Sequence, residues 1–84
     1  MKQLLLHIVL KDGKIAPTGA NILDEKGNYL TSIMGDGNIL ISNEQIGKQL
    51  ILRSPNKNDC VIEYNVPEVF SSELIYEEED AVCL

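Results

Sequence analysis

The sequence predicts an all-β fold, a small β-sandwich of about seven short strands with an Ig-like or plug-like arrangement. Turn signals built from Gly, Asn and Asp recur about every 8–12 residues, the spacing that β-sandwiches and barrels show. Between the turns, apolar and polar side chains alternate with the period of two that half-buried strands require. The sequence has no long amphipathic helical pattern, and its 84 residues favour a single domain over residues 1–84.

The first half of the chain is expected to hold a long strand followed by a hairpin. Gln3–Leu10 alternates in polarity and ends at the turn signal Asp12-Gly13. Ile15–Pro17 is expected to be a short extended piece that its proline confines to an edge or a bulge. Strands over 19–23 and 29–33 then flank a five-residue turn, in which Gly27 is expected at a positive φ.

The middle of the chain is expected to continue with a tight turn at Gly35–Asn38 and a strand over 38–41. The stretch 42–46 is the one place where a helical turn is expected, capped by Ser42 or Asn43, because short polar side chains can accept hydrogen bonds from the first backbone amides of a helix.

Two strands and a short tail element complete the predicted fold. Strands over 48–53 and 60–65 are joined by a polar loop and are expected to pair. Leu74–Tyr76 is predicted to be a final short strand. The acidic run Glu77–Asp80 that follows is interpreted as a solvated segment, with steering of a basic partner as its functional alternative.

Charge and hydropathy exclude several function classes. Seven Lys and Arg residues against 13 Asp and Glu residues give a formal net charge of −6. The basic residues are scattered, whereas nucleic-acid and anionic membrane surfaces attract clustered cations. No apolar run approaches the roughly 20 residues of a membrane-spanning helix. We therefore expect no nucleic-acid partner and no direct membrane insertion by this domain. Met1 is interpreted as an added start on a fragment of a longer chain.

The order of the turn and strand signals is more specific than any one of them. The relevant segments are Ile15–Ala20, Asp24–Asn28, Ile33–Leu40, Gly47–Leu52 and Cys60–Pro67, with Cys83 near the end. In this order they resemble the C-terminal domain of the outer-membrane ushers, which assemble pili and fimbriae by the chaperone–usher pathway. The resemblance covers about four-fifths of the chain. The chain departs from the family pattern in having no Trp and in having Thr18 where a Phe is usual.

The resemblance implies a non-catalytic domain on the periplasmic side of an outer-membrane usher. Its partners would be periplasmic chaperone–pilus subunit complexes and other domains of the same usher, held by binding alone and without a cofactor. Two alternatives stay open. The first is a stand-alone adhesive or carbohydrate-associated β-sandwich binding module, because sandwiches host many functions. The second is a small cytosolic enzyme or thiol regulator.

The two cysteines bear on these alternatives. Cys60 and Cys83 are the only cysteines, too few for the four ligands of a structural zinc site. In an oxidising compartment they would form a disulfide that ties the C-terminal segment to the preceding long strand. In a reducing compartment they would remain free thiols. A structural disulfide is the favoured prediction, with free thiols and a redox role as the alternatives.

The remaining polar motifs favour structural interpretations over catalytic or metal-binding ones. His7 lies in an alternating strand without a neighbouring motif that would supply a nucleophile, so we predict a strand-surface or partly buried histidine. Gly35–Gly37 is followed by strand-like residues and not by the helix that a phosphate-binding loop needs. The acidic turn at Asp24 lacks the twelve-residue calcium-loop pattern. We predict no catalytic residues and no metal site.

The strand pair 48–53 and 60–65 provides the predicted partner-binding surface. By alternation, the side chains expected to face the core are Leu50, Leu52, Ile62 and Tyr64. The outward-facing side chains, which are the predicted partner-binding residues, are Ile51, Arg53, Val61 and Glu63. Two aliphatic side chains beside an arginine form the mixed kind of patch that protein interfaces use. The alternative is a second packed face, or the isolated exposed aliphatic side chains that are common on protein surfaces.

Overall fold

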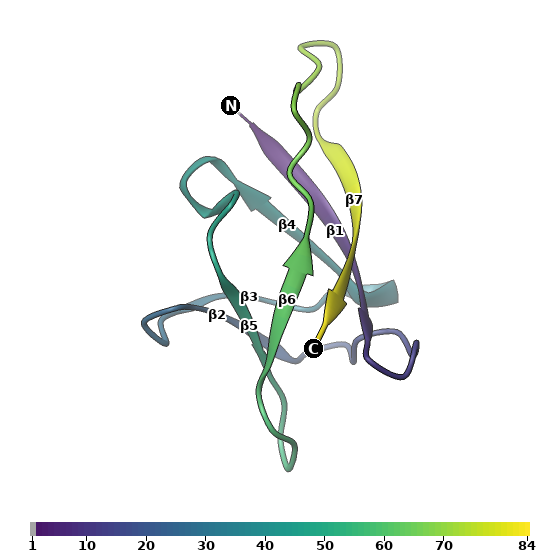
Figure 1. Cartoon of the computed structure of the whole chain (residues 1–84), viewed down its shortest axis with the longest axis vertical. Coiled ribbons are helices and arrows are strands. Elements are labelled where there is room, and N and C mark those ends of the chain that lie inside the picture. The colour runs from purple at the N-terminus through teal and green to yellow at the C-terminus, as the bar shows by residue number, and fades with distance from the viewer. Residues whose placement is uncertain (1) are drawn as a thin grey trace.

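The computed structural model describes residues 2–84, which form seven strands and two single-turn 3₁₀ helices (Figure 1). In chain order these are β1 (Gln3–Leu10), β2 (Asn21–Asp24), β3 (Tyr29–Ser32), η1 (Gly35–Gly37), β4 (Asn38–Ser42), η2 (Asn43–Gln45), β5 (Leu50–Arg53), β6 (Cys60–Tyr64) and β7 (Glu77–Cys83). All strands belong to one sheet with the order β3-β2-β5-β6-β7-β1-β4. None of the helices in this part of the chain is long and apolar enough to cross a membrane.

The sheet curls into a nearly barrel-like shape around one core. The prediction of an all-β fold with about seven strands is confirmed. Its sandwich and Ig-like details are not confirmed, because the strands make one continuous sheet. The edge strands β3 and β4 follow each other in the chain, and the Met34 N–H after β3 donates a hydrogen bond to the carbonyl of Asn38 at the start of β4, at 2.9 Å.

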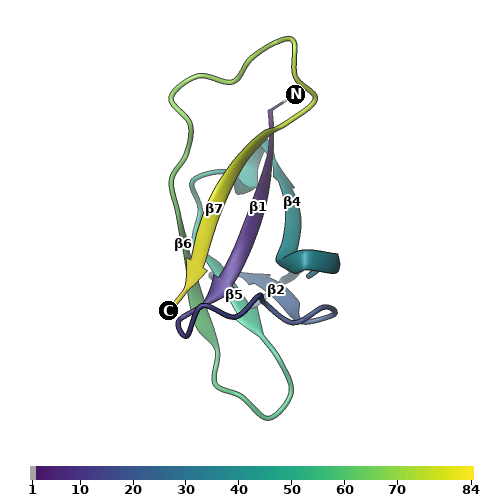
Figure 2. The same ribbon diagram turned by 90° about the vertical axis from the view of Figure 1, so that its right-hand side faces the viewer.

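Strand β1 lies between β7 and β4 and supplies the centre of the core. It pairs with β4 in antiparallel fashion and with β7 in parallel fashion over seven residue pairs (Figure 2). Leu4, Leu6 and Ile8 are fully buried, as the alternation predicts. Buried apolar residues from every strand except β3, together with Ala16, Ala20 and Ile33 from the connecting segments, complete this core, and Leu30 of β3 packs against it half-buried.

Most predicted elements are found within one or two residues of their expected bounds. Gly27 has a φ of +86°, as the hairpin turn requires. The helical turn appears as η2 with Ser42 at its N-cap position, and the Ser42 N–H donates a hydrogen bond to Gln45 Oε1. The extended piece before Pro17 is an isolated bridge between Val9 and Ile15. The turn expected at Gly35–Asn38 is a 3₁₀ turn over Gly35–Gly37, and the chain enters β4 at Asn38.

The prediction for the chain's end is wrong in one respect. Leu74–Tyr76 is not a strand, and the final strand β7 instead begins within the acidic run at Glu77. A glutamate-rich strand is possible here because its backbone pairs with β1 while no acidic side chain becomes fully buried. Glu77 and Glu79, which alternate with the exposed Glu78 and Asp80, are only half-buried beside Leu4 and Leu6 of β1. The acidic side chains therefore keep contact with water, as expected, although their backbone belongs to the sheet.

Candidate protein-interaction surface

A disulfide joins Cys60 at the start of β6 to Cys83 at the end of β7. The S–S distance is 2.02 Å and the two Cα atoms lie 5.4 Å apart. Residues 2–84 contain no free cysteine, so the favoured interpretation of the cysteine pair is confirmed over the free-thiol alternatives. The bridge fixes β7 against β6, and it thereby fixes the outward-facing side chains that these two strands carry.

The predicted binding residues lie together on the outside of β5 and β6. Ile51 is directly opposite Val61 in the antiparallel pair. Ile51 is half-buried, whereas Val61, Arg53 and Glu63 are exposed. The neighbours of opposite orientation face inward as predicted, since Leu50, Leu52 and Ile62 are buried in the core, with Tyr64 half-buried against it.

The end of the chain extends this surface with two apolar residues that sequence analysis missed, Val82 in β7 and Leu84 directly after it. The N–H of Val61 donates to the carbonyl of Leu84 at 2.8 Å, and the N–H of Leu84 donates to the carbonyl of Val61 at 2.9 Å. Val82 lies opposite Glu63. Both Val82 and Leu84 are exposed. We call the four apolar residues Ile51, Val61, Val82 and Leu84 the outer patch.

The predicted cation of this surface is already paired. The Arg53 guanidinium donates from Nε and Nη2 to the two carboxylate oxygens of Asp59, at 3.0 and 2.8 Å. These hydrogen bonds lower the pKa of the Asp59 carboxyl and raise the pKa of Arg53. The Arg53–Asp59 pair therefore has no net charge, and a partner at the outer patch would meet this pair and not a free positive charge.

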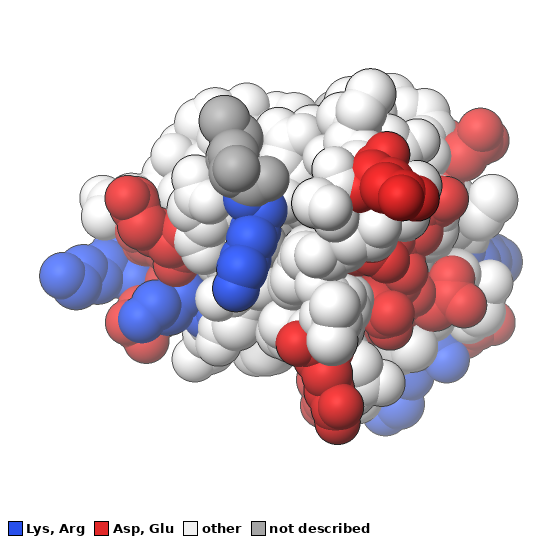
Figure 3. Space-filling view, turned by 90° about the horizontal axis from the view of Figure 1, so that it is seen from above, with Lys and Arg blue, Asp and Glu red and all other residues white. Residues whose placement is uncertain are grey.

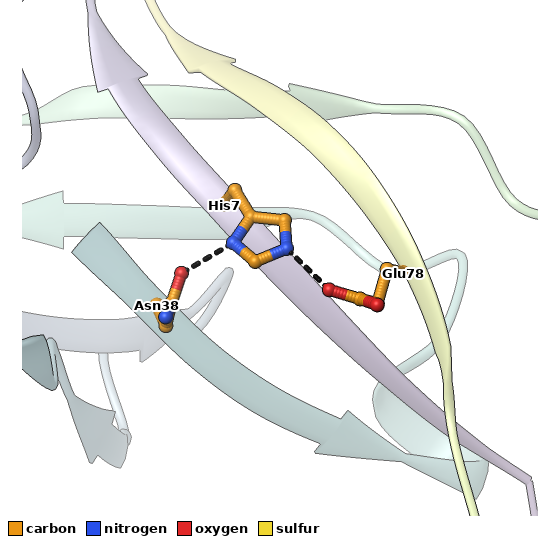
Figure 4. A network of polar contacts seen from close by, with 3 residues as sticks. All are labelled: His7, Asn38 and Glu78. Atoms are coloured by element: carbon orange, nitrogen blue, oxygen red, sulfur yellow. Dashed lines mark hydrogen bonds and ion pairs between the residues drawn. The ribbon is translucent and has the colours of Figure 1, made fainter. Parts of the chain in front are cut away.

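A second polar cluster lies on the outer face of β1. His7 lies between Asn38 of β4 and Glu78 of β7, with one ring nitrogen toward each (Figure 4). Its Nε2 is 2.8 Å from Glu78 Oε1. The hydrogen bond to Glu78, followed by the one to Asn38, raises the pKa of His7. The cluster links three adjacent strands, and the half-buried His7 confirms the prediction of a strand-surface or partly buried histidine.

The acidic turn after β2 has a structural use for its carboxylate. Asp24 accepts hydrogen bonds from the backbone N–H groups of Lys26 and Asn28, at 2.9 and 2.8 Å. These contacts, the one from Asn28 foremost, lower the pKa of the Asp24 carboxyl. The same hydrogen bonds close the turn, which fits the interpretation of this segment as a turn and not as a cation loop.

The fold and these surfaces define a small disulfide-bonded all-β domain, with an apolar outer patch beside polar side-chain pairs. A family model described as the PapC C-terminal domain matches residues 5–68. The chain is 33% identical over 82 residues to an uncharacterized outer membrane usher protein, YhcD, of Escherichia coli strain K12. The chain therefore belongs to the PapC C-terminal domain family, a family of usher domains and not a known enzyme family. The match covers 98% of this chain and 10% of the length of YhcD.

Solved structures agree with this assignment. The crystal structure of the C-terminal domain of the PapC usher has a TM-score of 0.70 and 29% identity, with 98% of each chain covered. PapC within an E. coli P pilus tip assembly intermediate, PapC-PapD-PapK-PapG, has a TM-score of 0.72 and 29% identity over 99% of this chain and 10% of that one. The Caf1A usher C-terminal domain has a TM-score of 0.77 at 15% identity, with 96% and 94% of the chains covered, and shows the common fold.

Proposed function

We propose that residues 1–84 act as the C-terminal domain of an outer-membrane usher and bind chaperone–subunit complexes during pilus or fimbria biogenesis. The domain lies on the periplasmic side of the outer membrane. It binds through the outer patch, with Arg53 and Glu63 at its rim. The role is non-catalytic, because the surface supplies apolar contact area for a partner and polar side chains that orient it. The family match supports the usher over a stand-alone adhesive or carbohydrate-associated module.

The observation that carries this proposal is the apolar outer patch itself. Its members lie on β5, β6 and β7 and at the residue directly after β7, and they are fixed by the Ile51–Val61 pairing, the two Val61–Leu84 hydrogen bonds and the disulfide. A surface that is ordered before binding loses little conformational entropy on association, so a patch of modest size can contribute to affinity. The presence of PapC with PapD, PapK and PapG in one assembly intermediate supports this class of partner.

The test is a binding measurement on the domain with purified chaperone–subunit complexes of its own pathway. We expect Val61→Ser with Leu84→Ser to weaken binding on the order of tenfold, the size of loss that truncating a few central interface residues causes. Ile15→Ser is the matched control, since it also removes an exposed aliphatic side chain but lies outside the patch. Equal binding by a folded double variant and the wild type would remove the outer patch from this role.

A further inference from the structure

The segment between β6 and β7 carries a second exposed apolar cluster, far from the outer patch. Residues 65–76, which we call the β6–β7 loop, project beyond one end of the sheet, whereas the C-terminus lies toward the other end (Figures 1 and 2). Side chains at the projecting end are unusually open, with Val69 78%, Leu74 57% and Ile75 81% exposed. Grouped exposed apolar side chains mark interaction sites more often than isolated ones do.

The base of this loop is fixed, so its apolar tip is presented in a defined way. Phe70 is half-buried and packs against the core, with the ammonium of Lys2 5.5 Å from its ring centroid. The Ser71 N–H donates to Glu77 Oε2 at 3.1 Å, and the Ser71 side chain accepts from the Glu73 N–H at 3.2 Å. These contacts anchor the segment on both sides of the tip and leave the aliphatic side chains facing outward.

The C-terminal stretch of the chain that contains this loop is strongly acidic. Residues 58–84 contain eight of the 13 acidic residues and none of the seven Lys and Arg residues. Seen from the loop end, acidic side chains are most numerous on the right half of the face, with others on the left, and Lys and Arg side chains lie at the left, in the centre and at the lower right (Figure 3). Glu68 and Glu73 belong to the loop itself, and both are exposed. An apolar tip with an acidic flank is complementary to an apolar groove with a basic rim.

We propose that the β6–β7 loop is a second docking element, whose tip inserts into an apolar groove rimmed by Lys and Arg side chains on the chaperone–subunit complex. The choice of the chaperone–subunit complex as partner rests on the proposed function. The apolar and acidic character of the docking element is inferred from the loop residues themselves. A membrane surface is the less suitable occupant, because anionic lipid headgroups repel the acidic flank. The length of β7 separates the tip from the outer patch by roughly 20 Å, at about 3.3 Å per strand residue. One partner contacting both sites would therefore be held at two points.

The test compares loop variants with the wild-type domain in titrations against the purified chaperone–subunit complex, at low and at high salt. Leu74→Ser with Ile75→Ser should raise the Kd on the order of tenfold, because it removes the tip's apolar contacts. Glu68→Gln with Glu73→Gln should slow association and flatten its salt dependence, because exposed charges act on encounter. Ile15→Ser and Glu25→Gln are the matched controls, and thermal unfolding confirms that each variant is folded.

Each result has a distinct meaning. Binding by the wild type together with equal binding by both loop variants would overturn the loop's role and leave the proposed function standing. Failure of the wild-type domain to bind the complex would overturn the proposed function, and with it the assignment of the loop to that partner. Binding of the wild type to phosphatidylcholine–phosphatidylglycerol vesicles, lost in the Leu74–Ile75 variant, would overturn the protein partner in favour of a membrane.

Discussion

Reduction of the Cys60–Cys83 disulfide should cost this domain a large share of its stability. The bonded residues are 23 positions apart, so the bridge closes a loop of about 24 residues. By the chain-entropy relation such a bridge stabilises the fold by about 3.5 kcal/mol. A chain of 84 residues at ~0.05–0.15 kcal/mol per residue has about 4–13 kcal/mol of total stability. Because one kcal/mol corresponds to about 4–8 °C at this size, the Tm should fall by about 14–28 °C.

The measurement is thermal and denaturant unfolding of the wild-type domain with and without a reductant, followed by circular dichroism. Reduction keeps both sulfur atoms in place, so it does not leave the cavity that Cys83→Ala would create in the core. The denaturant slope m should also rise, because the unfolded chain exposes more surface without the cross-link. If reduction lowers the Tm by less than about 5 °C and leaves m unchanged, the argument that the bridge acts by restricting the unfolded chain is refuted.

Two further predictions concern His7 on β1 and Gly37, whose backbone lies close to β1. The folded-state pKa of His7 is raised, so the stability from its contact with the β7 carboxylate is fully present below the unfolded pKa of 6.5 and is lost as pH rises through the higher folded value. For this exposed pair the loss is about 0.2–1 kcal/mol, and His7→Gln should abolish that part of the pH dependence of urea unfolding; an unchanged profile would contradict the assignment. Placing an alanine in the left-handed backbone conformation costs about 1–3 kcal/mol. Gly37→Ala should destabilise the fold by more than this, because the new Cβ would lie 2.5 Å from the Ile8 carbonyl oxygen. Gly27→Ala should cost only the backbone strain, because its Cβ would meet no atom within 4 Å. Equal losses of unfolding free energy in the two alanine variants would contradict the steric argument.

The strands that the sequence predicts best are those whose local pattern and tertiary environment agree. In β1 every second side chain is aliphatic and every one of these is buried or half-buried. In β5 and β6 the turn signals and the alternation set the register that brings Ile51 opposite Val61. For these elements a half-buried strand is the state that local sequence alone favours.

Strand β7 could not be predicted because its reason lies in another part of the chain. A run of acidic residues has low intrinsic strand preference, whereas the apolar triplet at Leu74–Tyr76 has a high one. The parallel pairing of β7 with β1 joins segments about 70 residues apart, and no local pattern encodes that contact. The error carried into the site, since Val82 and Leu84 complete the outer patch only once the end of the chain is a strand. Their alternation with the buried Cys83 was the available signal.

The pairing of Arg53 with Asp59 shows a second limit of the same kind. Both residues flank a polar loop whose composition predicts a turn but does not fix its geometry. Only the closed loop brings the guanidinium to both carboxylate oxygens. A sequence that predicts an exposed cation can therefore specify a neutral pair, and the electrostatic character of a predicted patch depends on loop geometry more than on composition.

Strand β7 links the disulfide to both proposed contact surfaces. It carries Val82 and leads into Leu84 at the outer patch, and it receives the β6–β7 loop through the Glu77 carboxylate that binds the Ser71 N–H. Parallel pairing with β1 requires closing a long connection, so β7 is the strand whose docking depends most on a covalent constraint. Oxidation of Cys60 and Cys83 should therefore stabilise the docked position of β7 and, through it, both proposed binding surfaces. A reduced domain that retains β1–β4 pairing but releases β7 would bind at neither surface, and hydrogen exchange on Ala81–Cys83 with and without a reductant measures that release directly.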